Sequence, residues 1–467
     1  MKRRNKYKRD IITICLIPII LTLVAIVGVA VGEGGNDTVP ASKSATAPRE
    51  TSPPTATIDV SPERMSITEP TNSPTTTAPE PTTTEPVTEP ATTASEPPAV
   101  GLLPDKPKMP PPRFVLRDDG TYHNPDADPT NRAVLMFTGD LMASYKHDSA
   151  AGRGRFDWSA CYDYVGDVLF RSDFAMANLE TMVSQSSPYI RAKTSIESPL
   201  GQLPYCNASP DFLKGVASVF DAVATANNHN LDTGILGINE TVDNLDDYNI
   251  LSNGLFKSGG GDRFLSVDVN GIKVAFISYV SGSINGFAGL YSDEELEQIN
   301  RYKRSTAARD IKAARNKGAE FVIVYMHWGT QNSQVISSSQ LGAAQELADI
   351  GADYILGAHP HVLQEYRVLT ATDGRKVPCY YSLGNFLSGM DMTPNNTNRD
   401  AVIACLELER DSDGTVRIVS EGYVPCYILL NYSGEQCVVK PMGEAYQNEA
   451  ARSRIRGALG NKVAEIF

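Results

Sequence analysis

Several common signatures of enzyme chemistry are missing from this 467-residue chain. There is no Gly-x-Ser-x-Gly motif, which argues against a serine hydrolase built on a nucleophile elbow. The glycine-rich stretch Ser258–Asp262 lacks the lysine of a P-loop and the strand-to-helix setting of a dinucleotide loop. We therefore predict a simple connecting loop there rather than a nucleotide site.

Cysteine is sparse, and its spacing excludes a zinc ribbon. The seven cysteines form no Cys-x-x-Cys pair. Cys15 lies in an apolar run, and the other six are Cys161, Cys206, Cys379, Cys405, Cys426 and Cys437. Six cysteines outside the cell permit many disulfide connectivities, and the sequence does not choose among them. The apolar surroundings of Cys379 and Cys405 fit buried thiols equally well.

The strongest basic cluster of the chain lies outside its main part. The net charge is −13, and the strongest concentration of Lys and Arg is in residues 1–10. We therefore expect no nucleic-acid partner for the remainder. An anionic substrate remains compatible with this charge, because a bound metal ion can outweigh the global field locally.

The N-terminal third has the pattern of a membrane anchor followed by a spacer. After the basic tail 1–10, Ile11–Gly32 carries no charge and exceeds the ~20 residues that a membrane-spanning helix needs. The basic flank predicts a single-pass cell-membrane protein with a cytoplasmic N-terminus and an extracytoplasmic main domain. A cleaved signal peptide is the alternative, with Ala30-Val31-Gly32 as the cleavage site. Residues 33–112 are rich in Thr, Pro and Ser, so we predict a disordered linker.

Residues 113–467 have the alternating pattern of one folded α/β domain. The predicted strands are Ala133–Thr138, Phe174–Ala177, Phe220–Ala226, Val274–Tyr279, Phe321–Met326, Tyr354–Gly357, Val377–Ser382, Ala401–Glu409 and Val416–Glu421. The predicted helices are Ile235–Tyr248, Asp293–Lys317, Ser338–Ile350 and one within Gly443–Val463. Asn270-Gly271 predicts a hairpin turn between Phe264–Val269 and Ile272–Tyr279. Two sheets packed together with helices outside, an α/β sandwich, would satisfy this order.

Polar residues follow these strands in series, and they suggest a metal site. The segments are Thr138–Asp140, Asn178–Glu180, Ala226–Asn230, Met326–Gly329, Gly357–His361 and Ser382–Phe386. In α/β folds, ligands gather at the carboxyl ends of strands, so these segments are expected to converge. On an extended backbone, His359 and His361 would project to the same side, held by Pro360. Imidazole pairs of this kind are suited to grip a divalent metal.

The order GD, NLE, NNH, HWG, HPH and SLGNF resembles the CapA family, the bacterial poly-γ-glutamate capsule-synthesis proteins of the calcineurin-like metallophosphoesterase superfamily. The resemblance covers about residues 133–386. It implies a four-layer α/β/β/α sandwich and one or two divalent metal ions, Mn, Fe or Zn. The metal ligands that it implies are Asp140, Glu180, Asn228, His327, His359 and His361, with Glu180 as the bridging carboxylate and His229 as the general acid. For Asn385, contact with substrate and a turn-stabilising role both remain open.

Two departures from the superfamily leave the activity open. Its first motif is often Asp-x-His, whereas this chain has Asp140-Leu141-Met142, and Glu180 stands where aspartate is usual. One interpretation is a metal-dependent hydrolase or transferase acting on an anionic polymer or phosphoester, with His229 protonating the leaving group. The other is a non-catalytic accessory of a poly-γ-glutamate synthesis and export complex, partnered by other capsule-synthesis membrane proteins.

Overall fold

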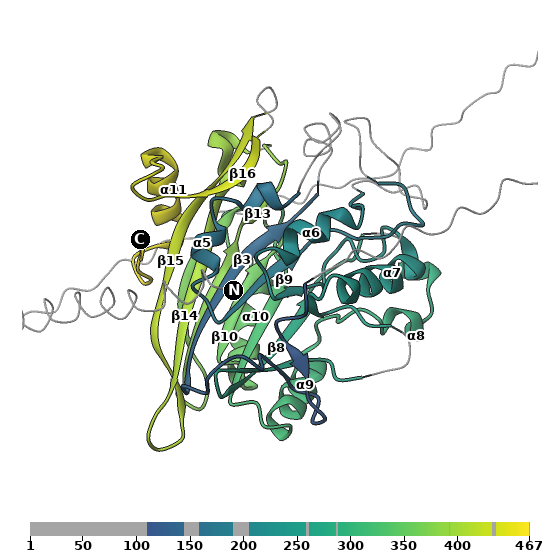
Figure 1. Ribbon diagram of the computed structural model, residues 1–467, viewed down its shortest axis with the longest axis vertical. Coiled ribbons are helices and arrows are strands. Elements are labelled where there is room, and N and C mark those ends of the chain that lie inside the picture. Colours follow the sequence, from purple (N-terminus) through teal and green to yellow (C-terminus); the bar gives the residue numbers. More distant parts are fainter. Residues whose placement is uncertain are drawn as a thin grey trace, which may run out of the picture. The chain divides into compact units, whose positions relative to one another are not determined.

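The computed structural model describes residues 110–143, 158–189, 205–257, 261–285, 288–391, 393–431 and 436–466. The predicted basic tail, membrane anchor and linker as far as residue 109 lie outside the described residues. In the described part, no helix has both the length and the apolar character required to span a bilayer. Figure 1 shows the α/β part of the chain as ribbons.

The first sheet has eight strands in the order β1-β2-β7-β8-β9-β10-β12-β11. Their bounds are β1 (Val115–Leu116), β2 (Tyr122–His123), β7 (Leu265–Val269), β8 (Ile272–Val280), β9 (Phe321–His327), β10 (Tyr354–Ala358), β11 (Leu363–Thr370) and β12 (Lys376–Leu383). Strands β8, β9, β10 and β12 are parallel. Their carboxyl ends therefore meet at one edge of the sheet.

The second sheet runs β16-β15-β14-β3-β4-β5-β6, with β13 paired to β3. Its strands are β3 (Arg132–Leu141), β4 (Phe174–Leu179), β5 (Ala222–Ala224), β6 (Leu251–Asn253), β13 (Asn385–Leu387), β14 (Asp400–Arg410), β15 (Val416–Asn431) and β16 (Gln436–Pro441). Strands β3 to β6 are parallel to one another. The carboxyl ends of β3 and β4 carry the first two predicted motifs.

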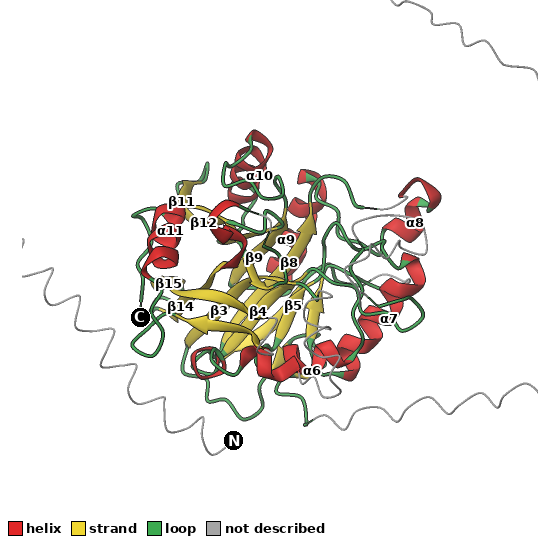
Figure 2. Cartoon of the chain, turned by 90° about the horizontal axis from the view of Figure 1, so that it is seen from above, coloured by secondary structure: helices red, strands yellow, loops and turns green. Residues whose placement is uncertain are grey.

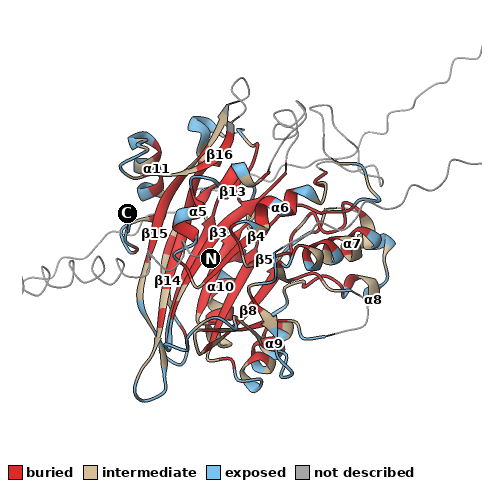
Figure 3. Ribbon diagram, viewed as in Figure 1, coloured by how far each residue is buried: buried red, intermediate tan, exposed pale blue. Residues whose placement is uncertain are grey.

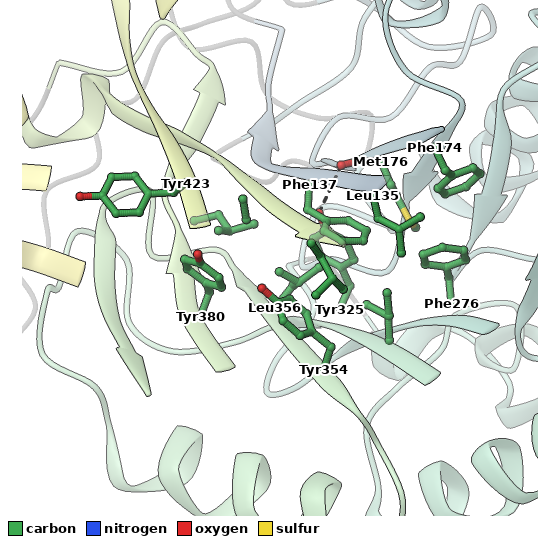
Figure 4. Packing of buried hydrophobic residues seen from close by; sticks show 14 of the residues in the cluster. Leu135, Phe137, Phe174, Met176, Phe276, Tyr325, Tyr354, Leu356, Tyr380 and Tyr423 are labelled. Atoms are coloured by element: carbon green, nitrogen blue, oxygen red, sulfur yellow. Dashed lines mark hydrogen bonds between the residues drawn. The ribbon is translucent and has the colours of Figure 1, made fainter. Parts of the chain in front are cut away.

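The main core lies between the two sheets. Phe137 and Phe174 of the second sheet pack against Phe276, Tyr325 and Tyr354 of the first, and all five are buried (Figure 4). The rings of Phe174 and Phe276 stack with centroids 4.8 Å apart. Burial of each such aromatic side chain contributes about 2 kcal/mol relative to exposure. This interface fixes the two sheets against each other and so sets the distance between their strand ends.

Helices cover the outer faces of both sheets (Figure 2). The helices are η1 (Trp158–Tyr162), α5 (Gly166–Leu169), α6 (Asp211–Ala217), α7 (Gly234–Asp247), η2 (Ala288–Leu290), α8 (Asp293–Leu296), α9 (Arg304–Asn316), α10 (Ser338–Asp349), η3 (Pro394–Arg399) and α11 (Glu449–Leu459). Elements η1, α5 and α6 pack on the second sheet, and α9 and α10 pack on the first. The central strands are consequently buried on both faces (Figure 3). The predicted two-sheet α/β architecture is confirmed.

The predicted helix over Asp293–Lys317 is wrong in its middle. The structure has the short α8, then an irregular segment 297–303, and then α9. The segment breaks the helix because its backbone pairs with strand ends instead. Ile299 bridges to Leu255, and Arg301 bridges to Val280. Tertiary pairing thus overrides a helical sequence pattern.

Other expected elements are present, but some begin or end at different residues. The hairpin turn is present, with positive φ at Asn270 (54°) and Gly271 (94°), as a type I′ turn requires. The strand expected over Phe220–Ala226 shortens to β5, because the chain turns at residue 225 toward the polar segment after it. The strand expected to stop at Glu421 instead continues to Asn431, since the second half of β15 pairs with β16.

Candidate metal centre

The two sheets bring their strand ends together where Asp140 meets the residues after β10. Asp140 lies near the end of β3, and its backbone N–H donates to the carbonyl of Gly384 at 3.0 Å. Gly139 permits this approach, because a Cβ there would lie 1.8 Å from the Gly384 carbonyl oxygen. A glycine before the aspartate is therefore a packing requirement of this junction, and it puts Asp140 beside His361.

A single carboxylate oxygen forms the centre of the candidate site. Glu180 follows β4 and is fully buried. Its Oε1 lies 3.4 Å from Nε2 of His327, 3.6 Å from Nε2 of His361, 3.8 Å from Nδ1 of His359 and 3.9 Å from Nε2 of His229. All four histidines of the predicted motifs thus turn a ring nitrogen toward the same oxygen.

The polar atoms of this cluster lack the partners that buried groups normally have. Neither carboxylate oxygen of Glu180, nor Nδ1 of His359, has a hydrogen-bond partner among the described residues. Buried polar atoms without partners are uncommon, and they call for a ligand or ion to complete them. Two donors each about 2.1 Å from one ion lie roughly 3–3.4 Å apart, close to the spacing seen here. These residues fit a divalent metal ion.

The donors divide into two groups that share Glu180. One group is Glu180, His327 and His359, and the other is Asp140, Glu180 and His361. Asn228 joins the first, because its Oδ1 lies 2.7 Å from Nε2 of His327. Oxygen and imidazole nitrogen donors of this kind suit Mn, Fe or Zn. The six predicted ligands are therefore brought together, and their roles as ligands stay a prediction.

The two histidines of the His359-Pro360-His361 segment reach the site by a route that the sequence did not predict. Both were expected on an extended backbone, yet φ is 93° at His359 and 57° at His361. These values lie in the left-handed region, which costs free energy for a residue with a side chain. The chain turns sharply after β10, and the turn rather than strand alternation aims both rings at Glu180.

Asp140 and Asn385 hold His361 in place. Nδ1 of His361 lies 3.0 Å from Oδ2 of Asp140 and 3.1 Å from Oδ1 of Asn385. The amide nitrogen of Asn385 donates to the backbone carbonyls of His361 and Asn398. Asn178, which the sequence analysis placed in a motif without assigning it a role, donates to the other oxygen of Asp140 at 2.8 Å. The substrate contact predicted for Asn385 stays a prediction; here its polar atoms position His361.

His229 is oriented by a residue that the sequence reasoning missed. Nδ1 of His229 lies 2.8 Å from Oδ2 of Asp232, which also accepts a hydrogen bond from the backbone N–H of Cys206. Burial disfavours the imidazolium, but the Cys206 sulfur and the Asp232 carboxylate outweigh it and raise the pKa of His229 well above its ordinary value. The spacing His-x-x-Asp was the available signal, since residues three apart can meet in a turn.

Burial and neighbouring charges also set the protonation of the ligands. Burial alone would raise the pKa of Glu180, but the imidazoles of His361 and His327 hold it well below its ordinary value. Burial lowers the pKa of His327 to about 4. At neutral pH, Glu180 is then an anion and His327 a neutral imidazole with a lone pair. Both are in the state that a metal requires of its ligands.

The two halves of the site are unequal. The half containing Asp140 has one imidazole, from His361, whereas the other half has two imidazoles and an amide. Met142 occupies the position that histidine has in the Asp-x-His motif. Its sulfur accepts a hydrogen bond from the Ser388 hydroxyl at 4.0 Å. The donor set is therefore stronger around His327 and His359.

Comparison with known proteins gives one family match and several relatives. The model described as bacterial capsule synthesis protein PGA_cap matches residues 134–390. The chain is 27% identical over 287 residues to the PGA biosynthesis protein CapA of Bacillus subtilis (strain 168), covering 60% of this chain and 69% of that protein. It is 27% identical over 274 residues to the capsule biosynthesis protein CapA of Bacillus anthracis, covering 55% and 60%.

Two solved structures show weaker similarity. Haemophilus influenzae NAD nucleotidase (NadN) matches with a TM-score of 0.36 and 12% identity, over 72% of this chain and 57% of that one. Sulfate thiohydrolase SoxB of Termus thermophilus matches with a TM-score of 0.32 and 14% identity, over 68% and 46%. The chain thus spans only about half the length of these two structures.

Proposed function

This chain belongs to the bacterial capsule synthesis protein family PGA_cap, and from that premise we propose that it acts in the synthesis of poly-γ-glutamate capsule or another cell-envelope polymer through a metal-dependent, hydrolase-like site. The names of the two CapA relatives support a role in the synthesis of a capsule polymer. The two-sheet fold, with donors at the strand ends, supports a metallophosphoesterase-type sandwich.

One observation carries the metal-dependent part of the proposal. Four imidazoles surround a buried glutamate oxygen that accepts no hydrogen bond from any described residue. A structural cluster would be expected to satisfy that carboxylate with N–H donors, since an unpaired buried charge costs several kcal/mol. The geometry instead leaves both Glu180 oxygens and Nδ1 of His359 unpaired in the interior, an arrangement that a cation would stabilise.

The residues around the centre divide the chemical work between them. A bound divalent ion would supply Lewis acidity and lower the pKa of a water molecule. Asp232 fixes the His229 ring through Nδ1, so that Nε2 faces the centre. The raised pKa of His229 keeps its ring protonated near neutral pH, as proton donation to a leaving oxygen or nitrogen requires. Asp140 and Asn385 keep the His361 ring from rotating.

We place the domain outside the cell, at the membrane. The charge pattern of residues 1–32 supports a single anchor with a cytoplasmic N-terminus. Residues 33–112 would then space the α/β domain from the bilayer. In this position the site would meet an anionic polymer or phosphoester, together with other membrane proteins of capsule synthesis.

A second function from another class rests on the inequality of the two halves. With Met142 in place of an imidazole, the Asp140 half offers a weaker set of donors. A non-catalytic accessory of a poly-γ-glutamate synthesis and export complex would need only one stable ion, or the anionic polymer itself, in this pocket. This alternative removes the turnover, whether the pocket holds an ion or the polymer.

Two measurements distinguish the hydrolase from the accessory: substrate turnover, and the effect of the His229→Ala substitution. The full chain is purified, its Mn, Fe and Zn content is measured, and phosphodiester and γ-glutamyl amide substrates are assayed. The hydrolase function predicts that His229→Ala keeps its metal and loses about 10²–10⁴-fold in rate. Absence of turnover on both substrate classes, in a metal-loaded protein whose deletion abolishes the capsule, supports the accessory. A protein that binds no metal contradicts the hydrolase function and leaves only an accessory that holds the anionic polymer in this pocket.

A further inference from the structure

Arg399 is a largely buried arginine whose guanidinium has no hydrogen-bond acceptor in the described part of the chain. Its side chain is 17% exposed, and Nε is buried without a partner. The ion pair that it makes with a described residue, between Nη2 and Oδ2 of Asp391, spans 3.8 Å. That separation is too long for a hydrogen bond, since charge-assisted N–H···O bonds are about 2.7–2.9 Å long. The five N–H donors of this guanidinium thus meet no acceptor among the described residues.

Other partly buried arginines of the same fold do satisfy their donors. Arg454 is 25% exposed, and it donates from Nε and Nη2 to the two oxygens of Asp400, the residue after Arg399. Arg410 is also 25% exposed, and it donates from Nε and Nη2 to the carboxylate of Glu320. Buried donors without acceptors are unfavourable, so the unpaired guanidinium calls for an anion.

The backbone around Arg399 is tied to the Asp140 and His361 half of the candidate metal centre. Nδ2 of Asn398, the preceding residue, donates to the carbonyl of His361 at 3.0 Å. The Asn398 carbonyl, in the peptide unit that leads into Arg399, accepts from Nδ2 of Asn385 at 3.0 Å. Asn385 also contacts Nδ1 of His361. Arg399 therefore directly follows a residue that is bonded to two members of the site, and the fold fixes its position.

This half of the centre is the one with fewer metal donors, because Met142 occupies the histidine position. An arginine on the segment tied to that half supplies a positive charge that does not depend on a bound ion. Its planar fork matches the two oxygens of a carboxylate or phosphoryl group. The side chain is exposed enough for such a group to reach it, and its partial burial strengthens the attraction.

We propose that Arg399 anchors an oxyanion group of the substrate at the edge of the Asp140 half of the site. The inference rests on the proposed function for the source of that group. In poly-γ-glutamate it is the free α-carboxylate that each glutamyl unit keeps, and in a phosphoester it is the phosphoryl group. Arg399 is a binding residue, and it takes part in no bond-making step. Holding one anionic unit of a repeating polymer fixes the position of the neighbouring bonds relative to the centre.

Calorimetric titration of the purified full chain with a γ-linked glutamate pentamer, and separately with inorganic phosphate, tests the inference. Arg399→Gln should weaken binding by about 10–100-fold, because it removes charge-assisted hydrogen bonds to the anion. Arg399→Lys should restore part of the affinity, since an ammonium keeps the charge but lacks the planar fork. Arg410→Gln is the matched control and should bind as the wild type does. Arg410 has a similar exposed fraction and lies at the opposite end of β14, with its donors met by Glu320.

Unfolding in urea without ligand distinguishes an anchoring residue from a structural one. Arg399→Met removes an unsatisfied guanidinium and keeps much of the apolar stem, so the urea midpoint should stay unchanged or rise. Arg410→Met should lower the midpoint, because it leaves the Glu320 carboxylate without its partner. A fall of the same size in Arg399→Met, with the affinity for both probes unchanged, would mark Arg399 as structural and overturn the inference.

The two probes identify the anion. Binding of the pentamer that depends on Arg399 identifies a carboxylate, and such binding of phosphate alone identifies a phosphoryl group. The inference is overturned if the wild type binds neither probe, if Arg399→Gln binds both as tightly as the wild type, or if Arg410→Gln weakens binding equally. The measurement is of binding and not of turnover or metal content, so the inference and the proposed function can fail separately.

Discussion

Substitution of Glu180 by glutamine gives a quantitative test of the shared carboxylate. The change removes one negative charge and keeps the shape of the side chain. The fully buried Glu180 contributes an oxygen to both donor groups, so both lose affinity together. Comparing each protein with and without metal cancels any cost of the substitution to the metal-free fold.

The expected change in the free energy of unfolding follows from the coupling of metal binding to folding. An ion at 100 times its Kd that binds only the folded state adds about 2.7 kcal/mol to the free energy of unfolding. If loss of the carboxylate raises Kd by about 100-fold, the same ion concentration adds only about 0.4 kcal/mol. For a domain of this size, the difference of about 2.3 kcal/mol corresponds to a shift of about 3 °C in the melting temperature.

The assay is thermal unfolding of the chelator-treated protein, with and without added Mn²⁺ or Zn²⁺. Glu421→Gln is the control, because Glu421 is a partly buried carboxylate on β15 that hydrogen-bonds Tyr366 and lies in none of the metal-capable groups found among the described residues. The wild type and Glu421→Gln should gain stability from metal, and Glu180→Gln should gain almost none. An equal gain in all three proteins would refute the reasoning.

Three further predictions rest on the fold and the charges. Gly357→Ala should lower the free energy of unfolding by about 3 kcal/mol in urea titrations, because its Cβ would lie 2.0 Å from the Tyr381 carbonyl oxygen; an unchanged midpoint would contradict this. Phe276→Ala should cost about 3–5 kcal/mol, since it leaves a cavity beside the stacked Phe174 ring, and a cost below about 1 kcal/mol would argue against the packing described. Metal affinity, measured by calorimetry, should weaken by about tenfold per unit as the pH falls below the raised pKa of His361. Burial opposes the rise in the pKa of His361, and the charge of Glu180 outweighs it. A proton on His361 therefore competes with the metal ion at low pH. A metal affinity that does not change with pH would count against His361 as a ligand.

Local patterns were enough to predict most of the strands and the convergence of the site. The buried run of β9 and the Asn-Gly turn before β8 have simple physical signatures, and each corresponds to the element expected. The six segments were expected to converge because ligands gather at the carboxyl ends of strands in α/β folds. The side chains of Asp140, Glu180 and His327 accordingly meet.

The features that the sequence did not predict depend on contacts between distant residues. The left-handed turn at His359 and His361 is imposed by the junction with Asp140 and Asn385, which no local pattern encodes. Segment 297–303 looked helical because its backbone pairing with residues 255 and 280 is invisible along the chain. The approach of Cys206 to His229 likewise results from a pairing across 24 positions, 182 to 206.

Anomalous diffraction from crystals of the protein, at the absorption edge of whichever metal it retains, tests the central claim most directly. The account predicts an ion within about 2.0–2.3 Å of Glu180 and of His327 or His359, with any second ion on the Asp140 and His361 side. A well-ordered crystal grown in saturating metal, with the Glu180 carboxylate and the four imidazoles in place and no anomalous peak among them, would contradict it.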